Sequence, residues 1–190
     1  MQSFAGLSFG MLLILLVGLG QFELVNARAD VVHNCPYAVW CAIVVGYQPD
    51  DPTPQPTRPA VTWVNQPAGA LLTSYFLDYP PDTGVAMMCT RDPSATTPLV
   101  TQLEYAWEQD EGQTYFDVSN VAGAPFVNEG FRMDVDDPED PTLALRSCHG
   151  ASCAPGDTTC NDVYEKSNDD FQGMRTCSDS VNINLTLCSG

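Results

Sequence analysis

Basic side chains are scarce in this chain, whose 190 residues include 7 Lys and Arg against 24 Asp and Glu, for a formal net charge of −17. A surface of that sign repels nucleic-acid phosphates and anionic membranes, so neither is expected as a partner. Histidine is nearly absent too, and neither His33 nor His149 shows the paired spacing that zinc sites use. We therefore expect no metal and no cofactor.

Helical periodicity is also missing, since no window of about a dozen residues carries an apolar stripe at helical spacing. An apolar run, Met11 to Leu19, precedes Ala27-Arg28-Ala29, whose small residues suit signal peptidase. A run this short cannot cross about 30 Å of hydrocarbon. The pattern predicts a signal peptide over residues 1–29, with cleavage after Gly20 as the alternative. It predicts one secreted domain over residues 30–190, with no membrane association after cleavage.

What the chain does contain is the pattern of β-strands. Short runs rich in β-branched and aromatic residues alternate with turn residues, which is typical of an all-β domain. The proline-rich stretch 48–59 can neither donate regularly to a sheet nor continue a helix, so we expect an extended loop there. The expected strands are residues 31–32, 37–45, 60–64, 70–77, 84–89, 99–107, 114–121, 131–135 and 181–187.

Two of these runs predict a hairpin with a defined register. If the polar turn 108–113 is symmetric about its centre, Leu103 faces Val118 and Tyr105 faces Phe116. Glu104 and Asp117 then oppose each other on the other face, with Cβ atoms about 5 Å apart. Carboxyl groups about 5 to 5.5 Å apart suit a retaining glycosidase, and their repulsion would raise one pKa. The same pair is equally typical of a plain solvated sheet face.

Eight cysteines follow the predicted signal peptide. An even number in a secreted chain indicates four disulfides, but eight cysteines allow 105 pairings and the count cannot choose among them. Because the thiols are assigned to bridges, we expect no Cys-His nucleophile, and no Ser-His-Asp arrangement competes. The acidic run 134–141 lacks the glycine and the terminal glutamate of an EF-hand, which favours a solvated loop over a calcium site.

Three blocks of sequence resemble the thaumatin-like proteins. Residues 32–40 (VHNCPYAVW) resemble that family's opening strand, and residues 103–105 (LEY) with 115–123 (YFDVSNVAG) resemble its central strands. The third block is the C-terminal cysteine framework, in which residues 160–177 and 181–188 are similar to the family's last segment. The resemblance implies a thaumatin-like β-sandwich of antiparallel strands with disulfide-stapled loops.

A departure from the family pattern lies between Cys153 and Cys160. Only six residues separate these cysteines, where typical thaumatin-like proteins insert a disulfide-rich second domain. The chain is therefore most similar to the small fungal type, which includes antigenic thaumatin-like and yeast-phase-specific proteins. We expect the second domain to be missing.

The resemblance also implies the disulfide pairing. Carried over position by position, the family's bridges correspond to the pairs Cys35–Cys188, Cys148–Cys177 and Cys153–Cys160, with Cys41–Cys89 left by elimination.

Candidate site residues come from the same resemblance. Family members that act on β-1,3-glucan have an acidic cleft of one arginine, one glutamate and three aspartates. Glu104 matches the glutamate and Asp117 the first aspartate, and the last aspartate corresponds to Asp169 or Asp170. These matches assign the catalytic role to Glu104 and Asp117.

Two positions of that cleft do not match. The second aspartate falls on Ala122, and the arginine falls on Cys89, with Arg91 two residues on as a substitute. Arg91, Asp169 and Asp170 are thus candidates for ligand binding, together with Trp107, which we expect to be an exposed aromatic platform at the hairpin end.

Three hypotheses for the function follow. The first is recognition at a cell wall or host surface, with β-glucan as the ligand. The second is a weak endo-β-1,3-glucanase, and the third is an extracellular effector or antigen that contacts a host protein. We expect a monomer. The sequon Asn184-Leu-Thr186 lies on the polar face of the last strand and predicts a glycan there.

Overall fold

The structure is a computed structural model that describes residues 27–46, 60–138, 147–169 and 172–189. The regular structure of these residues consists of strands and one short 3₁₀ helix. No helix in them is long and apolar enough to span a membrane. The elements in chain order are β1 Arg28–His33, β2 Val39–Val45, β3 Val64–Gln66, β4 Leu72–Tyr75, η1 Phe76–Asp78, β5 Val85–Thr90, β6 Thr101–Glu108, β7 Gln113–Ser119, β8 Phe131–Asp136, β9 Ala151–Cys153, β10 Arg175–Ser178 and β11 Asn182–Leu187.

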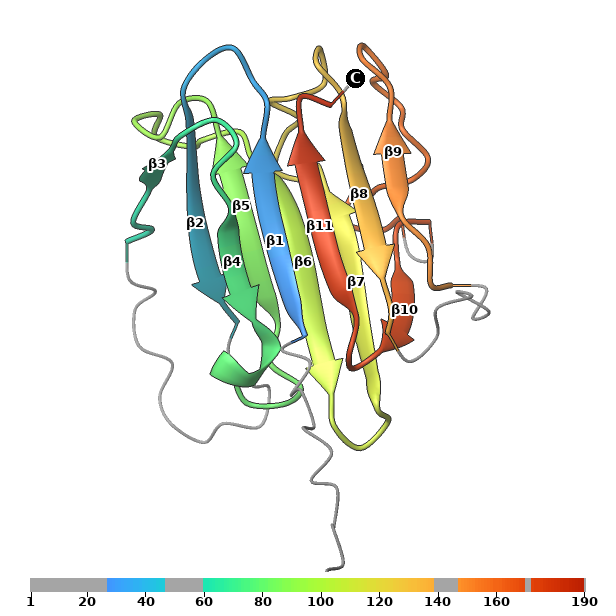
Figure 1. Cartoon of the computed structure of the whole chain (residues 1–190). Coiled ribbons are helices and arrows are strands. Elements are labelled where there is room, and N and C mark those ends of the chain that lie inside the picture. Colours follow the sequence, from blue (N-terminus) through green and yellow to red (C-terminus); the bar gives the residue numbers. More distant parts are fainter. Residues whose placement is uncertain (1–26, 47–59, 139–146, 170–171, 190) are drawn as a thin grey trace, which may run out of the picture.

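Two sheets stack face to face to form a sandwich (Figure 1). The five-stranded sheet has the order β4-β1-β11-β8-β9, and the six-stranded sheet has the order β10-β7-β6-β5-β2-β3. Within the five-stranded sheet β1 and β11 lie side by side and parallel, whereas both of their other neighbours are antiparallel. The predicted all-β sandwich is confirmed.

The core lies between the two sheets, because alternation along each strand sends every second side chain inward. From the six-stranded sheet come residues that are at most 3 % exposed, among them Leu103, Tyr105, Phe116 and Val118. The five-stranded sheet contributes Phe131, Met133, Ile183, Leu185 and Leu187, all at most 2 % exposed. Burying one such side chain fully stabilises the fold by about 1.5–3 kcal/mol.

The predicted hairpin register is confirmed. In the β6–β7 pair Leu103 opposes Val118, Tyr105 opposes Phe116 and Glu104 opposes Asp117. The symmetric turn and the strict alternation were enough to place these residues, because a slip by one position would have turned the apolar set to solvent.

Other strands differ from expectation. The strand expected over residues 60–64 is β3, which begins only at Val64, and the long run 70–77 divides into β4 and η1. The short strands β9 and β10 were not predicted. Each has three or four residues between turns, which is too short for alternation to be read from the sequence.

All four predicted disulfides are confirmed. Their Cα atoms lie 5.1 Å apart in Cys35–Cys188, 4.2 Å in Cys41–Cys89, 4.7 Å in Cys148–Cys177 and 5.6 Å in Cys153–Cys160. The first bridge joins residues 153 positions apart, at the ends of β1 and β11. It therefore fastens the first strand to the last.

The start of β1 conflicts with the expected domain boundary at residue 30. Ala27 and Ala29 are buried, and the Ala27 carbonyl accepts a hydrogen bond from the Phe76 backbone N–H at 3.1 Å. Arg28 pairs with Asn182 across the sheet. Cleavage after Ala29 would remove the first two residues of β1. The cleavage position stays a prediction, and the extent of β1 favours a site before Ala27.

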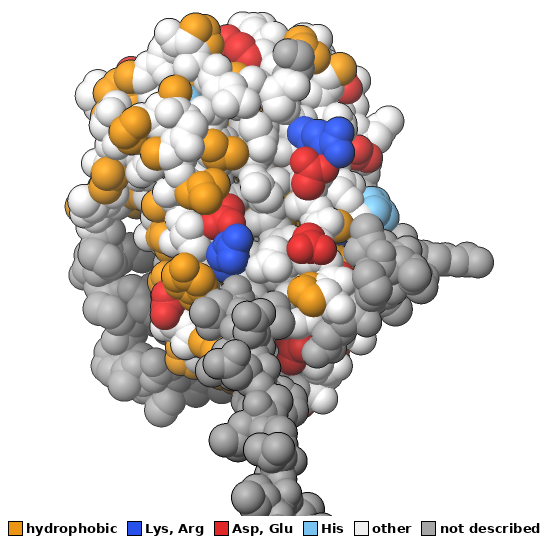
Figure 2. All heavy atoms as spheres, viewed as in Figure 1, with side chains coloured by type: hydrophobic (Ala, Val, Ile, Leu, Met, Phe, Trp, Pro, Cys, Tyr) orange, Lys and Arg blue, Asp and Glu red, His pale blue; other side chains and the backbone are white. Residues whose placement is uncertain are grey.

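The outward face of the five-stranded sheet is mixed in character. Figure 2 shows hydrophobic side chains gathered toward the β4 side and charged ones scattered over the rest. Leu71, Tyr75 and Leu77, in or beside β4, are 55 %, 42 % and 69 % exposed. The proline-rich stretch 48–59 and part of the acidic run lie outside the described residues.

Candidate functional site

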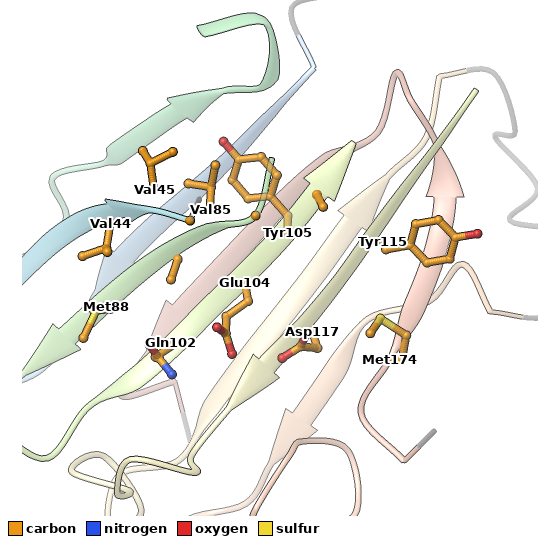
Figure 3. Close-up of a pocket in the computed structure, with 14 residues that line it drawn as sticks. Val44, Val45, Val85, Met88, Gln102, Glu104, Tyr105, Tyr115, Asp117 and Met174 are labelled. Carbon is orange, nitrogen blue, oxygen red and sulfur yellow. The ribbon is translucent and has the colours of Figure 1, made fainter. Parts of the chain in front are cut away.

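A row of side chains crosses the outward face of the six-stranded sheet. Register places Val44 of β2 beside Ala86 of β5, Ala86 beside Glu104 of β6, and Glu104 beside Asp117 of β7. Met174 precedes β10 and continues the row, because Arg175 pairs with Phe116. Two carboxylates thus lie at the centre of an otherwise apolar row, on one side of the sheet (Figure 3).

A groove of about 480 Å³ follows this row. Its lining includes Gly46, Gly84 and Ala106, whose short side chains leave a depression between larger neighbours. Met88 and Tyr115 also line it. From β2 to β10 the groove crosses five strands, so neighbouring strands about 4.8 Å apart give it a length of roughly 19 Å. Such a shape suits an extended ligand lying across the strands.

Asp117 is the unusual residue of the groove. The residue is only 8 % exposed, and its Oδ1 atom is buried with no hydrogen-bond partner among the described residues. Burial and, after it, the negative charge of Glu104 raise the pKa of Asp117 to about 7, although Arg175 acts in the opposite direction. Near neutral pH this carboxyl can hold or release a proton.

Glu104 shares this environment. Burial raises the pKa of Glu104, and a hydrogen bond from Ser119 partly offsets the effect. Because the two groups oppose each other on neighbouring strands, ionisation of one disfavours ionisation of the other. The pair therefore offers a proton donor and an acceptor at neighbouring positions.

Asp169 does not line the groove. Its Oδ2 accepts hydrogen bonds from the backbone N–H groups of Glu165 at 3.1 Å and Lys166 at 2.9 Å, so it fastens a turn. Asp170 lies outside the described residues.

Arg91 is also absent from the groove lining. Its guanidinium lies 3.9 Å from the centre of the Tyr37 ring and 3.8 Å from Glu129 Oε1. This cation–π contact and ion pair hold Arg91 elsewhere, so it does not substitute for the arginine of the family's acidic cleft.

Trp107 differs from the exposed platform that we expected. The side chain is half-buried and packs against the core, and its indole Nε1 donates a hydrogen bond to the Tyr79 carbonyl at 3.3 Å. Trp107 is not among the groove residues either. An aromatic residue that does line the groove is Tyr115, which opposes Ala106 on β6.

Sequence reasoning found the two carboxylates but missed the apolar residues around them. Val44, Met88 and Met174 line the groove from three separate parts of the chain. The strands β2 and β5 are apolar at nearly every position, so no polar–apolar alternation indicated which of their residues face the groove. Also lacking was the order of strands in the sheet, which alone shows that these residues flank Glu104 and Asp117.

Asn184 is exposed on β11, between Asp30 of β1 and Asp134 of β8. It belongs to the five-stranded sheet, on the opposite side of the sandwich from the groove. A glycan at Asn184 would therefore leave the groove open.

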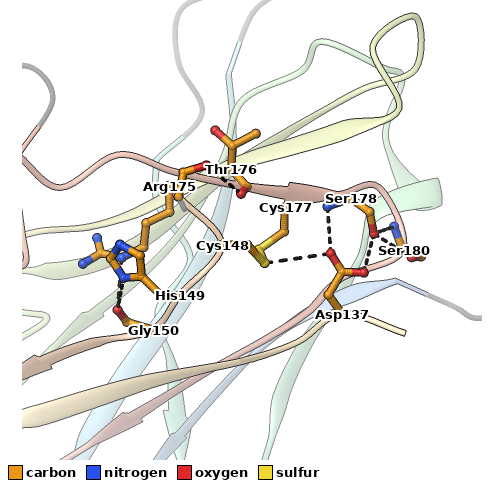
Figure 4. Close-up of a disulfide and its surroundings, with 10 residues drawn as sticks. Asp137, Cys148, His149, Gly150, Arg175, Thr176, Cys177, Ser178 and Ser180 are labelled. Carbon is orange, nitrogen blue, oxygen red and sulfur yellow. Dashed lines mark hydrogen bonds between the residues drawn. A yellow bond between two sulfur atoms is a disulfide. The ribbon is translucent and has the colours of Figure 1, made fainter. Parts of the chain in front are cut away.

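Asp137, Cys148 and Cys177 place possible metal-ligand atoms within 4.8 Å of one another (Figure 4). The two sulfurs are bonded to each other, and Asp137 accepts hydrogen bonds from the Ser178 backbone N–H at 2.9 Å and hydroxyl at 2.6 Å. These contacts connect the end of β8 to β10. The arrangement fits a structural joint rather than a metal site, because a disulfide provides no thiolate.

The two-sheet fold, the four bridges and the short Cys153–Cys160 loop together define a small thaumatin-like protein. More narrowly, the chain belongs to the family of the Blastomyces yeast-phase-specific protein (Bys1), whose profile matches residues 22–189.

Two curated relatives carry related names. The secreted thaumatin-like protein calA of Emericella nidulans is 29 % identical over 129 residues, which cover 65 % of this chain and 66 % of the relative. The antigenic thaumatin-like protein of Arthroderma benhamiae is 29 % identical over 91 residues, covering 48 % of this chain and 41 % of the relative. The matches thus span about two thirds and two fifths of those proteins.

Two solved structures share the fold. The protein elicitor MoHrip2 from Magnaporthe oryzae superposes with a TM-score of 0.59 at 20 % identity, covering 86 % of this chain and 99 % of the other. The thaumatin-like xylanase inhibitor TLXI gives a TM-score of 0.51 at 13 % identity, covering 85 % of this chain and 99 % of the inhibitor. At these identities the likeness concerns the fold alone.

Proposed function

We propose that this protein acts outside the cell and binds a β-linked polysaccharide, with β-1,3-glucan as the reference ligand, in the groove of the six-stranded sheet. The observation that carries the proposal is the Asp117 carboxyl, which lines the groove and whose buried Oδ1 has no hydrogen-bond partner among the described residues. A buried acceptor without a partner costs about 1–3 kcal/mol, and a sugar hydroxyl that donates to it recovers that cost.

Location outside the cell is supported by chemistry and by similarity. Four disulfides persist in oxidising compartments. One relative is named a secreted protein and another an antigenic one.

The groove has two kinds of surface that suit a sugar. Glu104 and Asp117 accept hydrogen bonds from hydroxyls, while Tyr115, Met88 and Val44 present apolar surface to the C–H face of a pyranose ring. Its extent across five strands suits several units of a chain rather than one.

Co-sedimentation of the purified secreted protein with insoluble β-1,3-glucan tests the proposal. Asp117→Asn should weaken the apparent affinity for the glucan about tenfold, and so lower the bound fraction. The reason is that the amide offers one acceptor oxygen where the carboxylate offers two. Asp136→Asn, an exposed carboxylate on β8 of the other sheet, is the matched control and should bind as the unchanged protein does. Equal loss in both variants, or no binding of the unchanged protein, would refute the proposal.

Glycoside hydrolysis is a second candidate function. It is favoured by the cross-strand pairing of Glu104 with Asp117 and by the raised pKa of both groups, which together provide an acid and a base. Against it, neither Arg91 nor Asp169 lines the groove. Release of reducing sugar from soluble β-1,3-glucan that disappears in Glu104→Gln would establish the activity, and clean protein without release would exclude it.

A third candidate, contact with a host protein, rests on similarity of fold to a protein elicitor and to an enzyme inhibitor. A host protein that is retained equally by the unchanged chain and by Asp117→Asn would place this contact away from the groove.

A further inference from the structure

The groove has an imbalance of charge. Its lining includes the carboxylates of Glu104 and Asp117, and no Lys, Arg or His is present among the described residues that line it. The two carboxylates directly oppose each other on β6 and β7, where like charges are destabilising. Their neighbours along the row, Ala86 and Met174, have no side-chain hydrogen-bond donor, although Glu104 receives a hydrogen bond from Ser119.

Arg175 is the cation that acts on Asp117, but it is not available to a ligand in the groove. It is 2 % exposed, and its guanidinium donates hydrogen bonds to the carbonyls of Gly150 and Gly173. The remaining nitrogen lies 3.9 Å from Asp162 Oδ1. Arg175 therefore weakens the excess negative charge without removing it.

The buried Oδ1 of Asp117 is a second, independent observation. The residue is more than nine-tenths buried, and no donor to this oxygen is present in the part of the chain that the structure describes. A neutral hydroxyl would supply one hydrogen bond and leave the repulsion between the two carboxylates in place. An ammonium group has three donors and a positive charge, so it can bridge both carboxylates and oppose their repulsion.

We propose that Glu104 and Asp117 form a subsite for a protonated amino group, and that the groove prefers a β-linked polysaccharide with free amino sugars over a neutral glucan. This inference rests on the proposed carbohydrate function of the same groove. The apolar neighbours fit the ring faces on either side of the charged unit, and they lower the local dielectric, which strengthens attraction between ammonium and carboxylate. N-acetylation of the ligand would remove the charge and with it the preference.

Proton release gives the subsite a distinct signature. Because Asp117 holds a proton below about pH 7, a bound cation should favour its ionised form and expel that proton. The charged groups that act on Asp117 are Glu104 on β6 and Arg175 on β10. Glu104 is acidic, and Arg175 does not line the groove, so neither places a positive charge there. A neutral ligand should release little or no proton.

Titration calorimetry at about pH 6 with three trimers tests the inference: β-1,4-linked glucosamine, its N-acetylated form and a neutral β-1,3-glucan trimer. A hydrogen bond to a charged group corresponds to roughly 10- to 100-fold in affinity, so the glucosamine trimer should bind at least tenfold more tightly than the other two. The same titration in two buffers of different ionisation enthalpy should show proton release for the glucosamine trimer.

Variants separate the subsite from the general acidity of the protein. Glu104→Gln and Asp117→Asn should each reduce the preference for glucosamine by about tenfold, and Asp136→Asn should leave it unchanged, at low and at moderate salt. If Asp136→Asn weakens binding as much as Asp117→Asn does, the attraction is diffuse and the subsite is refuted.

The outcomes also distinguish this inference from the proposed function. Binding of the neutral trimer as tightly as the glucosamine trimer would overturn the amino-group subsite and support glucan binding. Failure of all three trimers, together with failure of insoluble glucan to retain the protein, would overturn both. Tri-lysine that binds as tightly as the glucosamine trimer would overturn the assignment to amino sugars.

Discussion

The outward faces of the two sheets differ in which charged side chains lie beside their acidic residues. On the five-stranded sheet Asp30 lies 2.8 Å from Arg28 and Asp134 contacts Arg132, each partner being two residues away on the same strand. On the six-stranded sheet Glu104 and Asp117 face each other across two strands. The first face thus pairs two of its acids with arginines of the same strand, whereas the second sets its two acids against each other.

The difference shows why acidity in general says little about function here. Several carboxylates of the described residues serve local structure, such as Asp169 in its turn and Asp137 beside its disulfide. Asp117 differs from these because its buried Oδ1 has no hydrogen-bond partner among the described residues. Oε2 of Glu129 shares this feature, but the other oxygen of Glu129 lies 3.8 Å from Arg91, and Asp117 alone of the two lines the groove.

The largest effect on stability is expected from removing the Cys35–Cys188 disulfide, which joins the ends of β1 and β11 in the five-stranded sheet. Joint replacement of Cys35 and Cys188 by Ala should lower the free energy of unfolding by about 5 kcal/mol, because that bridge closes a loop of 153 residues. The seven-residue loop of Cys153–Cys160 predicts a loss of only about 2 kcal/mol for the matched double variant. Urea unfolding measures both, and equal losses would contradict the loop-length argument.

The next largest effect is expected from replacing Asp117 in the groove, and this substitution should raise rather than lower the free energy of unfolding. Asp117 has a folded pKa of about 7 against an ordinary value of 3.8, so the folded state binds its proton more tightly. Stability from this group is present below about pH 4 and is lost as the pH rises through 7. Asp117→Asn removes the loss and should therefore raise the free energy of unfolding by about 4 kcal/mol at pH 8, with little change at pH 4.

Unfolding by urea at several pH values measures this effect, with Asp136→Asn as the control. A variant that is destabilised at pH 8 would contradict it. Because Asp117→Asn should fold more stably than the unchanged protein, loss of ligand binding in that variant cannot be attributed to unfolding.

The first strand offers a third test, on the other sheet. A chain that begins at Asp30 lacks Ala27, Arg28 and Ala29, and with them two buried side chains and part of the β1 ladder. It should be less stable by about 2 kcal/mol than a chain that begins at Gln21. Mass spectrometry of the secreted protein should accordingly find a mature N-terminus before Ala27, and a start at Asp30 would contradict this prediction.

A smaller loss is expected when the paired acid of the five-stranded sheet is altered in the same way as Asp117. Asp30 is buried and accepts hydrogen bonds from Arg28 Nε and from the Thr73 hydroxyl. Asp30→Asn should lower the free energy of unfolding by about 1.5 kcal/mol, since hydrogen bonds to a charged acceptor are lost. A gain in stability at neutral pH would remove the contrast between the two faces.

The smallest effect should come from Asn184→Gln. The sequon lies on the face opposite to the groove, so removal of a glycan should lower the mass of the secreted protein without changing glucan retention. Weaker retention by Asn184→Gln would show that this face contributes to binding.

The two halves of the candidate site differed in how well the sequence predicted them. Glu104 and Asp117 were placed correctly because a hairpin with a symmetric turn is a local structure, and alternation fixes its register. Trp107 and Arg91 were not, since their partners Tyr79, Tyr37 and Glu129 come from segments distant along the chain. Asp169 has local partners, and its hydrogen bonds to two preceding backbone N–H groups belong to turn chemistry.

The sequence by itself determined the all-β class and the facing carboxylates, because strand alternation is a local pattern, and its resemblance to the thaumatin-like family implied the four bridges. Tertiary structure alone decided the rest. The order of strands brought Val44, Ala86 and Met174 into one row with the carboxylates, and burial between those neighbours left Asp117 without a donor. Burial and the order of strands arise from contacts between distant segments, which no local pattern specifies.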